Sequence, residues 1–326
     1  MRSKTMFRLG RTVAAACVAL ASVSSVAFAQ EKYPARPVEV IVPWGPGGGS
    51  DTTGRMVARF LEAELKASFP VINVPGASGV TGVQKLLLAP ADGYSIAVSG
   101  DYYALISAPN AKWTLDDFIP VAMAINQSGA IFAAENGRFK TWADVEKEAR
   151  AKPSTIKVVM AGYGIIDEIH VNILATKGMK LVAVPFPKPS ERYVSVLGGH
   201  AELMYEQAGD VKSYLVNKQM RPLLSFTEKR FPAYPDVPTA REMGYDAVTP
   251  QVRWVFMKAG TDPQRVKTIS DALTKMSKTP EYRKYLEDEI AAPDSFVPAS
   301  EARQYLRNML EGVRKEAAIA GIKTKQ

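Results

Sequence analysis

Three short glycine-rich segments are the residues best suited to hold a ligand. Each follows an apolar run and precedes an amphipathic run, and they cover residues 45–50, 76–79 and 162–164. Glycine lets backbone N–H groups approach a ligand closely, and the N-terminus of a helix after such a loop attracts negative charge. Each segment alone is more typical of an ordinary turn between a strand and a helix. The three together predict a site for an anion, by preference a carboxylate, held by backbone and hydroxyl donors.

Residues suited to catalysis are scarce. His170 and His200 are the only imidazoles, and the sequence lacks the G-x-S-x-G, H-E-x-x-H and G-x-x-x-x-G-K-[ST] patterns of serine hydrolases, zinc proteases and P-loop enzymes. Residues 162–167 imitate a dinucleotide-binding fingerprint, but Asp167 stands where its third glycine belongs. We therefore predict a binding protein without catalytic residues, cofactor or metal site. A periplasmic hydrolase is the less favoured alternative.

The elements that must position these loops follow an alternating pattern. Short apolar runs alternate with amphipathic runs, which is typical of an α/β fold with largely parallel sheets. The helix after the first glycine-rich segment is expected to be capped by Ser50 or Asp51, and Thr141 and Asp262 are expected to cap later helices. The predicted strands cover residues 38–42, 71–74, 94–99, 156–160, 181–185, 203–205 and 222–226.

Two extended segments predict that the chain passes twice between two domains. Residues 119–134 have more apolar length than one strand requires, and residues 248–257 could return the chain. We therefore predict two α/β domains joined by two hinge crossings around a central cleft, a design that closes by hinge bending. The predicted boundaries place residues 30–124 and 249–326 in domain 1 and residues 125–248 in domain 2.

The N-terminal segment has the pattern of an export signal. Four basic residues precede a small apolar run over 13–26, and Ala27-Phe28-Ala29 matches the A-x-A rule for cleavage. We predict a signal peptide over residues 1–29 and a soluble periplasmic product. The alternatives are a membrane anchor, for which the apolar run is shorter than the ~20 residues of a spanning helix, and a lipoprotein at Cys17.

Removal of this segment changes the charge and the cysteine content. The loss of its four basic residues lowers the formal net charge from +8 to +4. The segment also contains Cys17, the only cysteine of the chain. The mature protein therefore has no disulfide, thiolate nucleophile or cysteine-bound zinc. The mild positive charge could steer anions, but no basic block suggests a nucleic-acid partner, and we expect a monomer.

The chain is similar to the substrate-binding proteins of tripartite tricarboxylate transporters, also called the Bug or TctC family. The similarity extends over nearly all of the mature chain and rests on the order and spacing of short segments. These segments are residues 33–38 (YPARPV), 42–51 (VPWGPGGGSD), 74–79 (VPGASG), 91–94 (ADGY), 117–122 (DFIPVA), 197–199 (LGG), Arg230 with 235–239 (PDVPT), and 259–263 (AGTDP).

The resemblance implies a type II periplasmic-binding-protein fold and a carboxylate held between the first two glycine-rich loops. It also implies delivery of the ligand to the membrane permease subunits of a tripartite system, with an exported sensor that docks on a signalling receptor as the alternative. The residues that it implicates in ligand binding are Trp44, Pro46, Gly47, Gly48, Gly49, Ser50, Ala77, Ser78 and Gly79, together with Gly162, Tyr163, Gly164 and His170 from the other domain. A lone histidine on a helix is more often a buried polar anchor, which is the favoured alternative for His170, and Asp51 is expected to serve its helix rather than the ligand.

Two departures from the family pattern bear on specificity. Trp44 stands where many relatives have Phe, and residues 186–191 replace a small glycine-rich segment. If five aromatic side chains line the pocket, the ligand is expected to be an aromatic or bulky carboxylate. The alternative interpretation is that about half of them belong to the core. These side chains are Trp44, Tyr102, Tyr163, Phe186 and Tyr205.

Three charged residues carry open alternatives. Lys188 and Arg192 could pair with a second carboxylate of the ligand or lie on a solvated helix. Glu206 stands where relatives often have Asp, and it could meet the ligand through water or serve only the hinge.

Overall fold

The computed structural model describes residues 32–100 and 112–324. Residues up to Ala35 form a unit of their own, of which residues 32–35 are described and contain no helix or strand. The predicted signal peptide and Tyr102 lie outside the described residues. The fold below concerns the unit from Arg36 onward.

The first sheet has six strands in the order β11-β4-β10-β3-β1-β2. β1 is parallel to β2 and β3, whereas β10 is antiparallel to β3 and β4, and β11 is antiparallel to β4. The bounds are β1 Glu39–Val42, β2 Val71–Asn73, β3 Ser95–Ser99, β4 Phe118–Gln127, β10 Gln251–Lys258 and β11 Val297–Pro298.

The second sheet has five strands in the order β7-β6-β8-β5-β9. β6 is parallel to β7 and β8, and β5 is antiparallel to β8 and β9. The bounds are β5 Gly129–Ala134, β6 Lys157–Met160, β7 Val182–Pro185, β8 Leu203–Gln207 and β9 Met220–Ser225.

Both sheets are therefore mixed, and the prediction of largely parallel sheets is wrong for the strands that link them. β4 ends at Gln127 and β5 begins at Gly129, so the chain passes from the first sheet to the second through Ser128. β10 brings it back to the first sheet. These linking strands run against their neighbours because the connections are not the crossover helices that produce parallel pairs.

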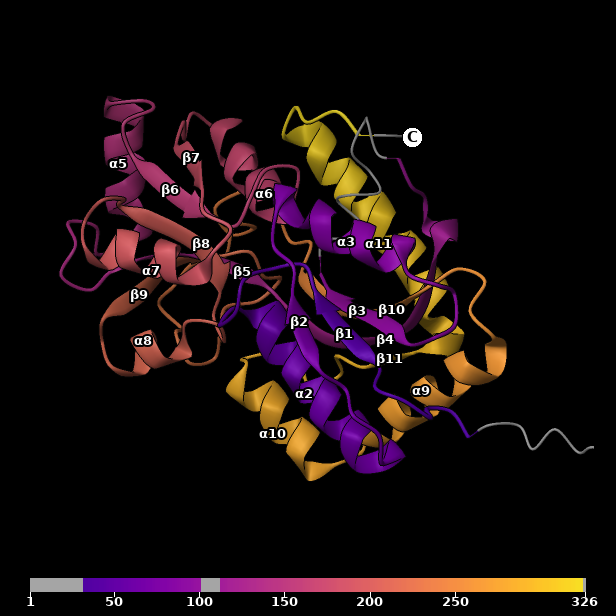
Figure 1. Cartoon of the computed structure of the whole chain (residues 1–326). Coiled ribbons are helices and arrows are strands. Elements are labelled where there is room, and N and C mark those ends of the chain that lie inside the picture. Colours follow the sequence, from indigo (N-terminus) through magenta and orange to yellow (C-terminus); the bar gives the residue numbers. More distant parts are fainter. Residues whose placement is uncertain (1–31, 101–111, 325–326) are drawn as a thin grey trace, which may run out of the picture. The chain divides into compact units, whose positions relative to one another are not determined.

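Helices cover both faces of the first sheet. In Figure 1, α3 and α11 lie on one side of it and α2 and α9 on the other. The bounds are α2 Gly49–Leu65, α3 Val80–Leu88, α9 Pro263–Met276, α10 Pro280–Asp288 and α11 Ala299–Ile319. Because helices cover both faces, the strands β1 and β3 are buried. Val40, Ile41 and Ile96 are inaccessible to solvent.

Two helices begin at polar caps that the sequence predicts. Thr141 forms a capping box with Asp144 at the start of α5, which is confirmed as predicted, and Asp262 caps α9 ahead of Pro263. The helices beside the second sheet are α5 Trp142–Ala151, α6 Ile166–Ala175, α7 Pro189–Leu197 and α8 Lys212–Val216. The predicted cap of α2 is wrong: Gly48 is its N-cap, without a side-chain hydrogen bond, because Ser50 and Asp51 already lie inside the first turn.

Candidate functional site

A small cavity lies between the loop that precedes α2 and residues of the second sheet. Its water-accessible volume is about 40 Å³, which leaves room for only a few water molecules. Five predicted site residues line it: Trp44, Gly48, Gly49, Ser50 and Glu206. The other lining residues are the polar or charged Asp167, Arg192, Gln207, Asp210, Gln251 and Arg253, and the small or apolar Ala161, Pro187 and Pro189.

The first glycine-rich loop is held by side chains of α2 and β2. The carboxylate of Asp51 accepts hydrogen bonds from the Gly47 N–H and from Asn73 Nδ2, both at 3.0 Å, and from Arg55. Asn73 Nδ2 also donates to the carbonyl oxygen of Trp44 at 3.0 Å. Burial opposes ionisation of Asp51, but the hydrogen bonds from Arg55, Gly47 and Asn73 outweigh it and lower its pKa. Asp51 therefore supports the loop, and this geometry fixes the backbone at the cavity wall.

The start of α2 contacts a buried ion pair. The N–H of Gly49 donates to Oδ2 of Asp210 at 3.0 Å, and Nη2 of Arg253 lies 3.0 Å from the same oxygen. A Cβ atom at Gly49 would collide with both side chains. Only glycine allows the guanidinium and the carboxylate to approach the helix so closely.

A second ion pair lines the cavity from the second sheet. Nε and Nη2 of Arg192 donate to Oε2 of Glu206 at 3.1 and 2.5 Å, and Nη1 donates to the Phe186 carbonyl oxygen at 2.7 Å. Both side chains are buried. Burial raises the pKa of Glu206, although Arg192 acts in the opposite direction. Arg192 is thus buried and paired rather than solvated, whereas Lys188 is exposed and pairs with Glu191.

The first glycine-rich loop lies close to the start of α7, and the second and third loops lie close to each other. A Cβ atom at Gly48 would lie 2.7 Å from Cγ of Pro189, and one at Gly162 would lie 2.6 Å from Oγ of Ser78. Ala77 and Ser78 adopt left-handed backbone conformations, with φ of 46° and 51°. Such conformations are costly for residues other than glycine and concentrate at functional sites. The second and third loops are therefore adjacent, although neither lines the small cavity.

Several predicted site residues lie elsewhere. His170 is inaccessible to solvent; its Nδ1 hydrogen-bonds with the Tyr205 hydroxyl and its Nε2 with Oε2 of Glu316, both at 2.9 Å. Tyr205 is also fully buried, so this pair belongs to the core. Tyr163 is half exposed, and Phe186 packs against a hydrophobic cluster of the second sheet. The remaining predicted residues that do not line the cavity are Pro46, Gly47, Ala77, Ser78, Gly79, Gly162 and Gly164.

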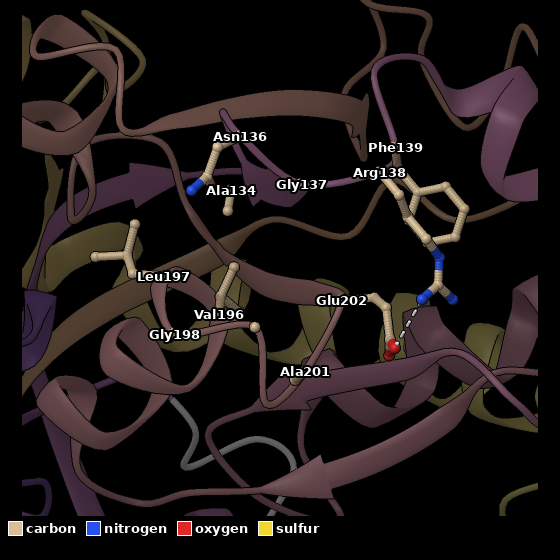
Figure 2. Close-up of a pocket in the computed structure, with 11 residues that line it drawn as sticks. Ala134, Asn136, Gly137, Arg138, Phe139, Val196, Leu197, Gly198, Ala201 and Glu202 are labelled. Carbon is tan, nitrogen blue, oxygen red and sulfur yellow. Dashed lines mark hydrogen bonds and ion pairs between the residues drawn. The ribbon is translucent and has the colours of Figure 1, made fainter.

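A larger hollow of about 350 Å³ contains none of the predicted residues. Figure 2 shows it between Ala134–Phe139 and Val196–Glu202, with Arg138 paired to Glu202 at 3.2 Å. Arg138 also pairs with Glu148 at 2.8 Å, so its charge is already engaged. Within residues 32–100 and 112–324, no group of three or more His, Cys, Asp or Glu side chains could hold a metal ion.

Sequence reasoning missed Asp210, Gln251 and Arg253. Arg253 stands inside the apolar segment V-R-W-V-F of β10, and it is 2% exposed. A charge in an otherwise apolar buried strand needs a partner, so this position carried a usable signal. Asp210, its partner, follows β8 and has no distinguishing pattern around it.

Comparisons with known proteins identify the family of the chain. The TctC family, described as tripartite tricarboxylate transporter family receptor, matches residues 54–324. The chain belongs to this family. A relative from Cupriavidus necator is named "UPF0065 protein in gbd 5'region". It is 29% identical to this chain over 319 residues, which are 96% of this chain and 94% of that protein.

Solved structures share the fold of this TctC-family chain. The periplasmic binding protein BugD has a TM-score of 0.81 at 20% identity, covering 89% of this chain and 99% of its own. Rpa4515 of R. palustris with adipate has a TM-score of 0.82 at 22% identity, covering 89% and 99%. MatC of Rhodopseudomonas palustris with bound malate has a TM-score of 0.79 at 21% identity, covering 88% and 100%.

These findings confirm the predicted family and the periplasmic-binding-protein fold. The family and the structural neighbours are periplasmic binding proteins, so the chain is a solute-binding receptor rather than an enzyme. Across residues 32–100 and 112–324, no helix combines the length and apolar character that a membrane span requires.

Proposed function

We propose that this receptor captures a small carboxylate in the periplasm and delivers it to a tripartite membrane permease. The observation that carries the proposal is the hydrogen bond from Gly49 N–H to a carboxylate oxygen of Asp210 at 3.0 Å. The N-terminus of α2 therefore has the geometry and the polarity to hold a carboxylate. The ligand carboxylate binds at this same wall of the cavity, beside Gly48 and Ser50.

The structural neighbours supply the ligand class. One was solved with adipate and another with malate, and both molecules are small carboxylic acids. The cavity of this chain has Trp44 in its lining, which favours a ligand with a flat or apolar body over a purely polar one. An aromatic carboxylate is therefore included in the proposal.

Domain closure accounts for the size of the cavity. A volume of about 40 Å³ is small for a dicarboxylate, so the walls would separate to admit the ligand. The walls come from the two sheets, and residues 30–124 and 249–326 would move against residues 125–248. The crossings at Ser128 and ahead of β10 would serve as hinges.

Export completes the proposal. The signal peptide would be removed after Ala29, so that the periplasmic protein begins at Gln30. The intact mass of periplasmic material tests this step, and a mass that retains Met1 or a lipid on Cys17 would contradict it.

A thermal-shift screen on protein from Gln30 onward tests the function. Aliphatic and aromatic mono- and dicarboxylates are the ligands, and a carboxylate that binds should raise the midpoint in proportion to its concentration. Uptake of that carboxylate should then depend on the gene for this chain. If deletion of the gene leaves uptake unchanged but abolishes a transcriptional response to the carboxylate, the alternative of an exported sensor is favoured.

A further inference from the structure

A buried chain of hydrogen bonds joins α6 and α11, two helices that lie beside different sheets. His170 of α6 bonds through Nε2 to Oε2 of Glu316 in α11 and through Nδ1 to the Tyr205 hydroxyl, both at 2.9 Å. All three side chains are buried, and none of them lines the cavity. The two helices lie against each other (Figure 1). The contact therefore bridges the two halves of the protein away from the proposed ligand site.

The donors and acceptors of this chain follow from the carboxylate of Glu316. Its Oε1 accepts from the N–H groups of Val248 and Thr249 at 2.9 Å. Burial raises the pKa of Glu316, but these bonds and that from His170 lower it overall, which favours the ionised form. An ionised carboxylate only accepts, so Nε2 of His170 donates to it. In the neutral ring, Nδ1 then accepts from the Tyr205 hydroxyl.

The two ends of the chain lie at the two segments that link the sheets. Residues 248–249 precede β10, which returns the chain to the first sheet. At the other end, a Cβ atom at Gly129 would collide with the Tyr205 hydroxyl. Gly129 is the first residue of β5, directly after the first crossing. A few residues at such crossings absorb the rotation of hinged domains, so this chain is placed to influence the rotation without touching a ligand.

The walls of the cleft are in contact in this structure. The hydrogen bond from Gly49 to Asp210 and the ion pair of Lys212 with Asp288 at 2.9 Å each join elements beside different sheets. In a receptor that opens and closes, the apparent affinity falls with the fraction of molecules in the binding-competent form. A hydrogen bond that is made in the closed form and broken on opening therefore strengthens binding from a distance.

We propose that the hydrogen bond between His170 and Glu316 is a latch that favours the closed form of the cleft. This inference rests on the domain closure of the proposed function and names a contact that regulates it. On opening, Oε1 of Glu316 keeps its bonds to the crossing, whereas Oε2 loses His170 because α6 turns with the second sheet. Phe226 stacks on the His170 ring with 4.4 Å between the ring centroids, which holds the imidazole ready to bond again.

Distances between two spin labels, measured by pulsed electron paramagnetic resonance, report the balance of open and closed forms without any ligand. The labels are attached at Val216→Cys on α8 and Glu287→Cys on α10, both exposed, in protein from Gln30 onward, which has no other cysteine. His170→Leu removes the donor, and the ratio of closed to open form should fall by at least about fivefold, the scale of one net hydrogen bond. His170→Gln, which still has a donor for Glu316, should stay closer to the wild type.

Tyr282→Phe is the control for a loss of stability alone. The Tyr282 hydroxyl donates to the Ala124 carbonyl oxygen at 2.7 Å, and both residues belong to the half of the protein that contains the first sheet. This variant should keep the label distances of the wild type. Opening in Tyr282→Phe as large as in His170→Leu would overturn the latch, because any loss of stability would then open the cleft.

Two further results would overturn the inference. One is the same distribution of distances in the wild type and in His170→Leu, and the other is equal opening in His170→Leu and His170→Gln. If His170→Leu does not fold, Glu316→Gln, which weakens the same bond, takes its place. The thermal-shift screen tests the proposed function separately. A carboxylate that binds while the label distances ignore both changes at His170 would leave the receptor standing and remove only the latch.

Discussion

The N–H of Gly49 donates a hydrogen bond to Oδ2 of Asp210, and 161 residues separate these two partners. Gly49 begins α2, which packs on the first sheet, and Asp210 follows β8 of the second sheet. The contact therefore links the two halves of the cavity wall. It also shows that a backbone N–H at the N-terminus of the helix already donates to a carboxylate oxygen.

Closure of the cavity can be tested at Gly48. Gly48→Ala would place a Cβ atom 2.7 Å from Cγ of Pro189, so the two walls could not approach as closely as they do here. We expect weaker ligand binding with an unchanged fold, measured by calorimetry and circular dichroism. Gly45→Ala is the matched control, because its Cβ atom would lie 3.6 Å from the Lys188 and Pro189 side chains, an ordinary contact. Equal affinity of the two variants would argue against closure at this contact.

Glu316 is expected to stabilise the fold in its ionised form. Its Oε1 accepts from the N–H groups of Val248 and Thr249 at 2.9 Å, and its Oε2 meets His170. Burial raises its pKa, but the bonds from His170, Val248 and Thr249 outweigh this and lower it. Because the folded pKa lies below the unfolded value, this stabilisation is complete above the unfolded pKa and is lost as the pH falls through the folded one.

Glu316→Gln should therefore lower the free energy of unfolding near pH 7 by about 1–3 kcal/mol, the scale of a buried charge-assisted hydrogen bond. The variant should lose less stability than the wild type between neutral pH and pH values below the usual carboxyl range. Urea denaturation across this range measures both effects. Glu311→Gln, exposed on the same helix, is the control. If Glu316→Gln has the same pH dependence of stability as the wild type, the ionised form of Glu316 does not stabilise the fold.

The buried pair of Arg192 and Glu206 should be costly to break. Glu206→Gln leaves the guanidinium buried without its countercharge, and we expect a loss of about 3–5 kcal/mol in the free energy of unfolding. Lys188→Gln changes an exposed pair and should leave the denaturation midpoint close to that of the wild type. Similar midpoints for both variants would contradict the pairing as a structural requirement.

Trp44 should report ligand binding by its fluorescence. All four tryptophans are buried, and of these Trp44 alone lines the cavity, since Trp113, Trp142 and Trp254 are absent from its wall. Trp44→Ala should weaken binding of an aromatic ligand by ~1–3 kcal/mol, the scale of a lost aromatic contact surface. Trp44→Phe should keep most of the affinity and lose the fluorescence change. Affinity that is unaffected by Trp44→Ala would refute the aromatic wall.

Local patterns predicted the elements well because they depend on nearby residues. The strand over 38–42 and the capping box of Thr141 are read from apolar spacing and from residues three positions apart. The cap of α2 failed for a local reason as well. The helix begins two residues earlier than Asp51, and the carboxylate of Asp51 bonds back to Gly47 instead.

The charged lining of the cavity could not be predicted in the same way. Asp210 and Arg253 are 43 residues apart and belong to different sheets, so their pairing depends on the assembled fold. The role of His170 could not be predicted for the same reason, because its hydrogen-bond partner Glu316 lies 146 residues away in the sequence. The positions of the glycine-rich loops between strands and helices were predictable because they follow from local sequence, and their role in ligand binding stays a prediction.

The most direct measurement of the central claim is NMR of protein labelled with ¹⁵N-glycine, titrated with the carboxylate that gives the largest thermal shift. Gly→Ala variants assign the resonances. We predict that the amide signals of Gly48 and Gly49 shift on binding, because the carboxylate lies at the N-terminus of α2, while Gly312 in α11 stays unchanged. Shifts confined to Gly198 and Gly199, which line the larger hollow of Figure 2, would place the ligand there and contradict the account.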